Sequence, residues 1–447
     1  MIDSKSESFG NDRFYRISDK LFSKKRAIED KLYRNAKSFF NLTNSLVLYD
    51  LTNTYFEGRK PDSKIAGFNR SKDKRNDRPL ITLALVVDQM GFPKQSRILS
   101  GACVEIETIP NLLDQLQDDR MNWLTPEKTI VIDAGMASDK NLALIRERGL
   151  HYVAVSRKRK YSEDFWDSAV EESIPLADSK QSLTVRLIKT ETEIFLLCRS
   201  PHKLIKEQSI ITRRQQKFEK ALRTLNENLS KKRATKRYDK ILEKIGRLKQ
   251  QYQVGYLYTI DVQHTDDLCT YISFQKKNPS PQKPPGEYVL RTDRLDLSAQ
   301  NISEIHRSLT TIEDSFSSMK GHLGLRPNFH HTDAPTIAHI FITVLAYHIM
   351  SVILKKLKNR NINYNWSTLR SILSTHIRLT STMQTKEQKT IHIRSNTRPD
   401  ERQTLIYNAL GIAHDPLGQV KSIYPSNHKC SDENLSSKNL NSIISTT

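Results

Sequence analysis

Apolar residues form an almost continuous run at 46–51, in a chain that is otherwise rich in charge. A run of this kind without helical spacing predicts a buried strand. Asp50 lies inside it, and strand alternation puts Asp50 on one face with Thr52 and Thr54. A carboxylate in a buried strand is costly without a partner, so we expect Asp50 to bind a ligand or to act in catalysis. The alternative is an Asp that begins a turn, although no Gly or Pro follows before Gly58.

Two further apolar runs follow, at 80–87 and 94–99, separated by a turn at 88–91. Together with the first strand they predict a three-stranded antiparallel unit. A helix is predicted next, over 109–120, because its leucines recur with helical spacing.

A second acidic position ends a short apolar run. Residues 130–132 predict a buried strand that ends at Asp133, and Ser138 is placed to cap a helix over 139–148. Another apolar strand is predicted at 150–156. Ligands in α/β sheets bind at the carboxyl ends of strands, which favours a functional Asp133. Taken alone, the segment fits a simple turn-forming Asp before a glycine equally well.

A single helix is predicted over 303–323, and Pro327 stops its continuation. Its apolar positions recur at three- and four-residue steps: Ile305, Leu309, Ile312, Phe316 and Met319. His306, Glu313 and Lys320 are seven residues apart, which puts them on one side of such a helix. Together they could hold a metal ion and a phosphate, and the alternative is a solvated polar face.

The intervening residues, 158–286, have a different character and predict an inserted subdomain. They contain a hairpin-like stretch, a long charged helical stretch and two strand-like segments, at 183–198, 203–252, 256–262 and 271–276. Within 201–250, Lys and Arg number 16 and Asp and Glu number 5, a net charge of +11. Two helices joined near 231–235 explain the apolar spacing. A solvated, coiled-coil-like hairpin is the alternative, but the single-sign excess favours contact with phosphates.

The composition of the chain limits the kinds of partner that it could bind. The chain has 447 residues, enough for two or three domains, and a net charge of +21 with pI near 9.6. Such a balance implies a polyanionic partner, either nucleic acid or an anionic membrane surface. The apolar segment 337–354 contains two histidines and precedes two lysines, so we interpret it as a buried core helix rather than a membrane span. The N-terminus is polar and lacks the pattern of a secretory signal.

The four cysteines lie far apart, at Cys103, Cys198, Cys269 and Cys430, and no pair has zinc-ligand spacing. A reducing cytosol fits this usage best, so we expect a cytoplasmic, nucleoid-associated protein. The pattern of residues 1–45 predicts a helix over part of this segment. The helix could be a DNA-contacting arm or a packing helix with solvated charges.

Asp50, Asp133 and Glu313, with a large insertion before the third acid, resemble the catalytic residues of the DDE transposases of bacterial insertion sequences. The resemblance spans residues 46–345. It implies an α/β fold similar to that of ribonuclease H and the retroviral integrases. Such a fold has a mixed sheet with flanking helices, here interrupted by an inserted β-strand and basic helical-hairpin subdomain.

Two shorter segments add to the resemblance. The basic loop at 59–79 contains the residues of a Gly-x-Ser-Lys-Asp-x-Arg segment: Gly67, Ser71, Lys72, Asp73 and Arg75. In the insertion-sequence-four-like branch, a Tyr and an Arg precede the Glu and the Lys. Here Glu313 and Lys320 match, whereas His306 and Leu309 replace the Tyr and the Arg. The segment 326–331 is similar to the one that follows this helix in the family.

The resemblance implies metal-dependent cleavage and strand transfer at the ends of a DNA element. Such chemistry uses two divalent ions about 4 Å apart, and Mg²⁺, or Mn²⁺, suits carboxylate ligands. Asp50 would bridge both ions, and Asp133 and Glu313 would each hold one. Residues expected to contact double-stranded DNA, at the inverted repeats and the target, are Lys320, His306, Lys72, Arg75, Arg326, Lys231, Lys232, Arg233, Lys236 and Arg237.

We expect a homodimer on DNA and no membrane partner. Because His306 and Leu309 depart from the signature, cleavage should be slow or absent. Only 49 residues precede Asp50, which suggests an N-terminally shortened copy. The alternatives are a non-catalytic nucleic-acid-binding protein derived from a transposase and, less favoured, a structural or membrane-surface protein.

The predicted domain organisation has six parts. They are a short basic segment (1–45), a first half of the core (46–157), the insertion (158–286) and a second half of the core with the Glu helix (287–357). A C-terminal segment (358–425) and a disordered tail (426–447) follow.

Overall fold

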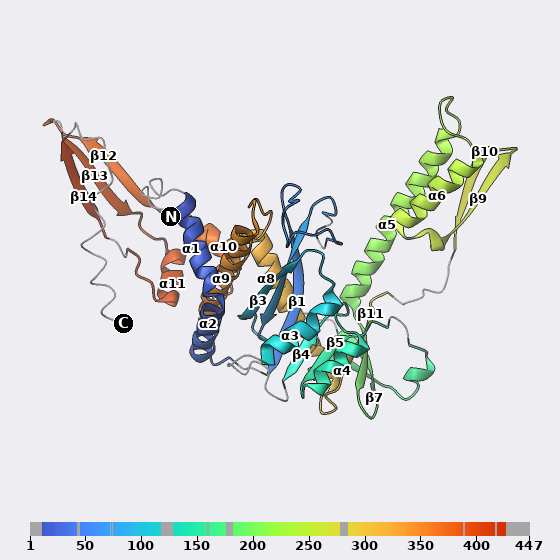
Figure 1. Cartoon of the computed structure of the whole chain (residues 1–447), viewed down its shortest axis with the longest axis horizontal. Helices are drawn as coiled ribbons and strands as arrows, with labels where there is room; N and C mark the ends of the chain where they lie inside the picture. Colours follow the sequence, from blue (N-terminus) through green and yellow to red (C-terminus); the bar gives the residue numbers. More distant parts are fainter. Residues whose placement is uncertain are drawn as a thin grey trace. The chain divides into compact units, whose positions relative to one another are not determined.

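The fold is mixed α/β, with a large mixed sheet and many helices (Figure 1). It is seen in a computed structural model of the chain. The structure describes residues 11–42, 45–71, 73, 75–117, 128–158, 161–175, 182–277, 285–387, 389–415 and 418–425. The chain divides into two compact units, Met1–Val104 with Thr310–Thr447, and Glu105–Leu309. The predicted tail at 426–447 lies outside the described residues.

The first unit contains three antiparallel strands in the order β3-β2-β1. They are β1 (Leu46–Tyr55), β2 (Leu80–Val87) and β3 (Pro93–Ser100). Every residue of β2 is buried, as its apolar run predicts. The predicted three-stranded antiparallel unit is therefore confirmed, and the turn between β2 and β3 includes Gly91 at φ +85°.

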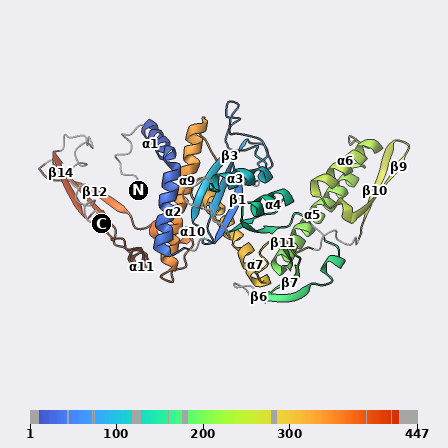
Figure 2. The same ribbon diagram turned by 60° about the horizontal axis from the view of Figure 1, so that its bottom comes forward.

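One long apolar helix organises the helices of this unit. The helices are α1 (Asn11–Ser23), α2 (Lys25–Phe40), α8 (Leu309–His322), α9 (Asp333–Lys358), α10 (Trp366–Leu373) and α11 (Glu401–Leu410). In the described part of the chain, α9 is the one helix long and apolar enough to cross a membrane. It packs against α1, α2, α11 and β3, as expected of a core helix (Figure 2).

A buried carboxylate joins α2 to the sheet. Glu29 is 6% exposed and accepts hydrogen bonds from the backbone N and the Oγ of Ser96, on β3. The ammonium of Lys25, one turn earlier on α2, also donates to Glu29. Burial raises the pKa of this carboxyl group, and its three donors oppose that rise. The pairing explains how a helix rich in Lys and Arg docks on the core.

The C-terminal part of the first unit contains more structure than the sequence predicts. Three antiparallel strands, β12 (Arg378–Gln384), β13 (Lys389–Asn396) and β14 (Val420–Pro425), follow the order β12-β13-β14. The sequence predicts only a short strand at 391–393, and it misses β12, β14 and α11. The sequence pattern of this segment also predicts a helix over 366–373, and the structure confirms it as α10.

The second unit contains strands in the order β4-β5-β11-β8-β7-β6. They are β4 (Thr129–Ile132), β5 (His151–Val155), β11 (Glu287–Thr292), β8 (Ile194–Arg199), β7 (Ser182–Lys189) and β6 (Val170–Pro175). The β4–β5 pair is parallel and the pairs from β5 to β6 are antiparallel. The accompanying helices are α3 (Thr108–Gln117), α4 (Asp139–Glu147) and α7 (Ala299–Arg307).

Helices α5 (Pro201–Asn228) and α6 (Tyr238–Tyr252) form a hairpin backed by β9 (Tyr258–Thr265) and β10 (Leu268–Lys276) (Figure 1). This four-element module has its own core, centred on Phe218, Leu222 and Ile241. The two helices predicted to join near 231–235 are confirmed. Within the predicted insertion at 158–286, β6, β7 and β8 belong to the same sheet as β11, whereas the α5–α6 and β9–β10 module has a core of its own.

The single helix predicted over 303–323 is wrong. The structure has two helices, α7 and α8, which meet at Ser308. The hydroxyl of Ser308 donates to the carbonyl of Ile305, one turn back, and such a bond competes with the helical pattern. Periodicity alone does not reveal this break, because the apolar spacing continues across it.

A buried histidine predicts how stability depends on pH. His348 of α9 is 5% exposed, and burial lowers its pKa from 6.5 to about 4. Between these values the unfolded chain binds a proton that the folded chain does not. We therefore expect the free energy of unfolding to fall as pH drops from about 6.5 to about 4, by up to ~3 kcal/mol from this group.

The measurement is urea unfolding at neutral pH and near pH 4.5, for the parent chain and for His348→Leu. The variant should lose less stability on acidification than the parent does. His264→Gln, which changes an exposed histidine on β9, is the matched control. An equal acid-induced loss in the parent and in His348→Leu would show that His348 does not carry this dependence.

Candidate active site

Asp50 lies in the middle of β1 and not in a turn. Its strand neighbours Tyr49 and Leu51 are buried, and Asp50 itself is half-buried opposite Leu85 of β2. Its Oδ1 accepts a hydrogen bond of 2.7 Å from the backbone N of Leu51. Because hydrogen bonds hold the strand to β2, the carboxylate has a well-defined backbone position. This placement excludes the turn-forming alternative.

Glu313 is exposed on α8, in the same unit as Asp50. The opposite side of α8 is apolar, with Ile312, Phe316 and Met319 buried as their spacing predicts. Helix α8 therefore rests on the core by one face and presents Glu313 to solvent. Lys320 lies two turns further along the same helix, as predicted.

Asp133 follows β4 directly, in the second unit, and is exposed. Its Oδ1 accepts from the backbone N of Ala134 at 2.7 Å, and its carbonyl accepts from Met136 at 3.1 Å. Ser138 then caps α4 by accepting from the backbone N of Asn141, which confirms the predicted cap. Asp133 thus forms a turn and stands at the end of a strand, a position that fits both interpretations of the segment, and its functional role stays a prediction.

His306 belongs to α7 and therefore does not share a helix with Glu313 and Lys320. The predicted line of three residues on one helix is wrong at this position. The half-buried His306 ring lies 5.3 Å from the ring of Tyr288. Burial lowers the pKa of His306 to about 4, the charge of Asp133 opposes that shift, and Lys203 and Arg307 add to it. A pKa this low leaves His306 neutral at neutral pH in the chain without DNA.

The three predicted metal ligands come from both units, Asp50 and Glu313 from the first and Asp133 from the second. Within either unit, the described residues include no group of three or more His, Cys, Asp or Glu side chains that could hold a metal ion. A metal site made of these carboxylates therefore stays a prediction. Their donor atoms are all carboxylate oxygens, which is the chemistry that Mg²⁺ and Mn²⁺ prefer.

Two cations predicted to contact DNA share one carboxylate. Asp73 Oδ2 lies 3.1 Å from the ammonium of Lys320, and Asp73 Oδ1 lies 2.6 Å from Nη1 of Arg326. Arg75 lies two residues after Asp73. Its guanidinium is 4.6 Å from the centre of the Tyr55 ring and pairs with Asp77 at 3.0 Å. Lys72, a further predicted DNA contact, lies outside the described residues.

The remaining predicted DNA contacts gather at one end of the α5–α6 hairpin. Lys231, Lys232 and Arg233 are exposed in the connection between the helices, and the described residues supply no carboxylate that pairs with them. Lys236 is half-buried, and Arg237 pairs with Asp239 at 2.8 Å. The hairpin is thus a packed scaffold with a cluster of exposed cations at its end.

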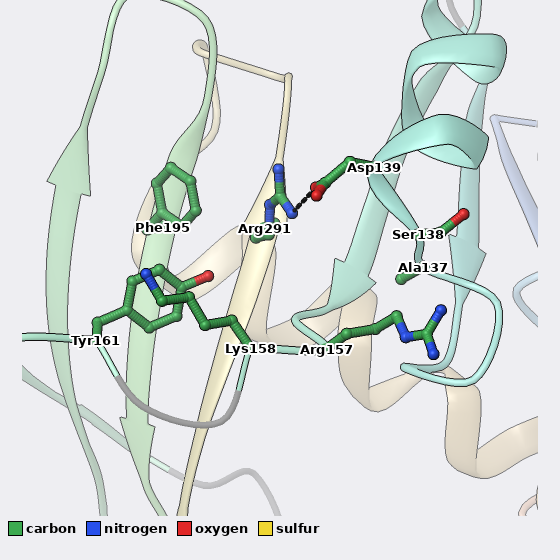
Figure 3. A pocket seen from close by; sticks show the side chains of 8 residues that line it. All are labelled: Ala137, Ser138, Asp139, Arg157, Lys158, Tyr161, Phe195 and Arg291. Carbon is green, nitrogen blue, oxygen red and sulfur yellow. Dashed lines mark hydrogen bonds and ion pairs between the residues drawn. The ribbon is translucent and has the colours of Figure 1, made fainter.

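A pocket of about 440 Å³ in the second unit is also rich in cations (Figure 3). Its lining residues are Ala137, Ser138, Asp139, Arg157, Lys158, Tyr161, Phe195 and Arg291. Arg291 pairs with Asp139 at 2.7 Å and with the buried Glu193 at 2.9 Å, and its guanidinium faces the Phe195 ring. Arg157, which is exposed, has no carboxylate partner among the described residues. The pocket therefore combines cations and aromatic rings, a combination suited to a nucleotide.

The sequence pattern did not identify this pocket. Arg157, Phe195 and Arg291 come from separate segments, and only the pairing of β11 with β5 and β8 brings their strands together. A basic pair directly after the predicted strand at 150–156 was the one available signal.

The chain matches a known protein family over most of its length. The family model described as "Transposase DDE domain" matches residues 43–349. This match covers more than half of the chain and includes Asp50, Asp133 and Glu313. The chain therefore belongs to the DDE-domain transposase family.

Among solved structures, the chain is similar to a piggyBac transposase in a synaptic complex with hairpin DNA. The two share 10% sequence identity, and the TM-score is 0.31. The similarity covers 72% of this chain and 54% of that one, so this chain spans about half the length of the piggyBac structure. No curated protein sequence matches the chain.

The neutral state of His306 is testable. We expect the His306 ring to titrate near pH 4 in the parent and at lower pH in Asp133→Asn, because the variant removes the charge that opposes the shift. The measurement is an NMR titration of ring resonances, assigned with His306→Gln. Asp167→Asn, which changes an exposed acid elsewhere in the second unit, should leave the His306 pKa unchanged. A His306 pKa near 6.5, or no response to Asp133→Asn, would contradict this account.

Proposed function

We propose that the chain is a DNA transposase of a bacterial insertion sequence, in the insertion-sequence-four-like branch, with a ribonuclease H-like catalytic core. The observation that carries the proposal is the family match over 43–349, which includes all three acids that the sequence singles out. The mid-strand position of Asp50 and the strand-end position of Asp133 support it. The proposed setting is the cytoplasm, on the nucleoid.

The proposed chemistry is cleavage and strand transfer at the ends of the element. Two divalent ions, when bound, would supply activation of the attacking oxygen and stabilisation of the leaving oxygen. In this proposal Asp50, Asp133 and Glu313 are their ligands. Because β1, β4 and α8 are regular elements packed on a core, they hold the backbone of each ligand in place.

The proposed partner is double-stranded DNA, bound by a homodimer. The exposed cations between α5 and α6 support this partner, as does the net charge of +21. The pocket around Arg157 and Phe195 would accept a phosphate and an adjacent base. His306 would act as a neutral hydrogen-bonding group rather than as a cation.

A second candidate is a nucleic-acid-binding protein derived from a transposase that no longer cuts. The observation that favours it is the altered signature, with neutral His306 and apolar Leu309 where the insertion-sequence-four-like branch has Tyr and Arg. Both candidates predict salt-sensitive DNA binding, and cleavage separates them.

The test of the first candidate is nicking of a labelled duplex that carries the sequences flanking the coding region, with Mg²⁺, with Mn²⁺ and with chelator. We expect metal-dependent cleavage that is slow. It should fall by a factor of at least roughly a hundred in Asp50→Asn, Asp133→Asn and Glu313→Gln, because each variant removes a metal ligand.

Asp167→Asn and Glu147→Gln are the matched controls, since both acids are exposed and lie outside the predicted site. They should cut as the parent does. Cleavage that survives any of the three site substitutions would contradict the assignment of that ligand. Salt-sensitive binding without cleavage under any metal would favour the second candidate.

Restoring the family signature needs a stability control. Leu309 is 9% exposed, so Leu309→Arg would put a charged group in a buried position. We expect the His306→Tyr, Leu309→Arg chain to cleave DNA faster than the parent. The two cleavage rates should be compared at a temperature at which both proteins are folded.

The basic hairpin should contribute much of the DNA affinity. Changing Lys231, Lys232, Arg233, Lys236 and Arg237 to Gln should flatten the dependence of log K on log salt, by up to ~0.9 per lost phosphate contact. The measurement is fluorescence anisotropy with a labelled duplex over a range of salt concentrations.

The control removes the same charge from exposed cations of the first unit, by changing Lys358, Arg360, Arg370, Lys386 and Arg402 to Gln. It should change the slope less than the hairpin variant does. Equal slopes for the parent and the hairpin variant would show that the hairpin is a solvated support without DNA contacts.

A further inference from the structure

The contact of Asp73 with Lys320 and Arg326 joins three segments of the first unit. Lys320 lies near the end of α8, Arg326 follows six residues later, and Asp73 comes from the basic loop between β1 and β2. Lys320 is 10% exposed, Asp73 18% and Arg326 34%. The ammonium is therefore well covered, and the guanidinium keeps an open side.

Two cations that lie together repel each other unless an anion offsets the repulsion. The Asp73 carboxylate bonds to both, at 3.1 Å to Lys320 and 2.6 Å to Arg326. The three charges sum to +1, so the cluster still attracts an anion. The Arg326 guanidinium has five N–H donors in a plane, and its pairing with Asp73 is through Nη1.

The loop fixes where Asp73 stands. The backbone N of Asp73 donates to the hydroxyl of Ser71 at 3.1 Å, and the backbone N of Ser71 donates to Asn76 Oδ1 at 3.0 Å. Ser71 itself is buried. At the base of the loop, Gly67 and Leu80 exchange two backbone hydrogen bonds, of 3.0 and 2.7 Å. The backbone of Asp73 is thus held by its own loop, and the two cations hold its carboxylate.

We propose that Asp73 is a positioning residue that holds Lys320 and Arg326 together as a grip for one DNA phosphate. The inference rests on the proposed function, since it assumes that these cations meet DNA. Arg326 presents its open donors to the phosphate in a fixed orientation, which is the geometry in which guanidinium and phosphate pair most strongly. Lys320 adds positive charge behind it.

If Asp73 instead competed with the phosphate, removing its charge would change the DNA affinity in the opposite direction. If Asp73 only occupied the place of the phosphate, removing its charge would leave the site free and more positive, and DNA would bind more tightly. If Asp73 positions the cations, removing its charge lets them separate, and DNA binds more weakly although the protein has become more positive.

The experiment measures binding of the full chain to a fluorescein-labelled duplex of random sequence, over a range of salt concentrations. The variants are Asp73→Asn, the double variant Lys320→Gln with Arg326→Gln, and the triple variant. We expect Asp73→Asn to bind about tenfold more weakly than the parent, with a salt slope shallower by ~0.9. The triple variant should bind like the double variant, because Asp73 acts through the two cations.

Asp73→Glu, which keeps the carboxylate, is the conservative control and should retain affinity within about threefold of the parent. Thermal unfolding of each variant identifies a general loss of structure. If losing Asp73 disrupts the structure, the triple variant should bind DNA more weakly than the double variant. That result would overturn the positioning role. Unchanged or tighter binding by Asp73→Asn, with a parent that binds DNA, would overturn the inference alone. A parent without salt-dependent DNA binding would overturn the proposed function as well.

Discussion

A carboxylate that leaves water costs free energy unless a cation or hydrogen-bond donors compensate it, and the proposed site depends on this constraint. Asp50 is half-buried in β1, between the buried side chains of Tyr49 and Leu51. An apolar residue would suit such a strand better if stability alone mattered. In the proposed site a divalent ion would compensate Asp50, and β1 fixes the backbone from which this carboxylate projects.

The positive charges of the chain serve in two different ways. Some are paired locally, as in the contacts of Lys25 with Glu29 and of Arg291 with Glu193, and these hold helices and strands in place. Others, at the end of the α5–α6 hairpin, are exposed and unpaired within the described residues. Asp73 stands between these classes, because it compensates two cations only in part. The positions of the cations that lack a carboxylate partner in the described part of the chain therefore say more about DNA binding than the net charge of +21 does.

Sequence patterns predicted most of the core and the placing of Asp50 within a strand and of Asp133 at a strand end. Continuous apolar runs predicted β1, β2 and β4 because both faces of these strands are covered. The exposed strands β12 and β14 carry no such run, and they were missed. The break at Ser308 depends on one side-chain hydrogen bond, and the neutral state of His306 depends on burial by Tyr288 and the surrounding residues. Such long-range effects leave no periodic signal in the sequence.

The central proposal is that Asp50, Asp133 and Glu313 are all ligands of the divalent ions. The most direct measurement replaces Mg²⁺ with Fe²⁺ on the full chain bound to DNA, and generates hydroxyl radicals that cut the backbone beside the ion. The account predicts cuts in three separate segments, within β1, in the turn after β4 and along α8, all suppressed by excess Mg²⁺. Cuts confined to one or two of these segments would contradict a site built from all three acids.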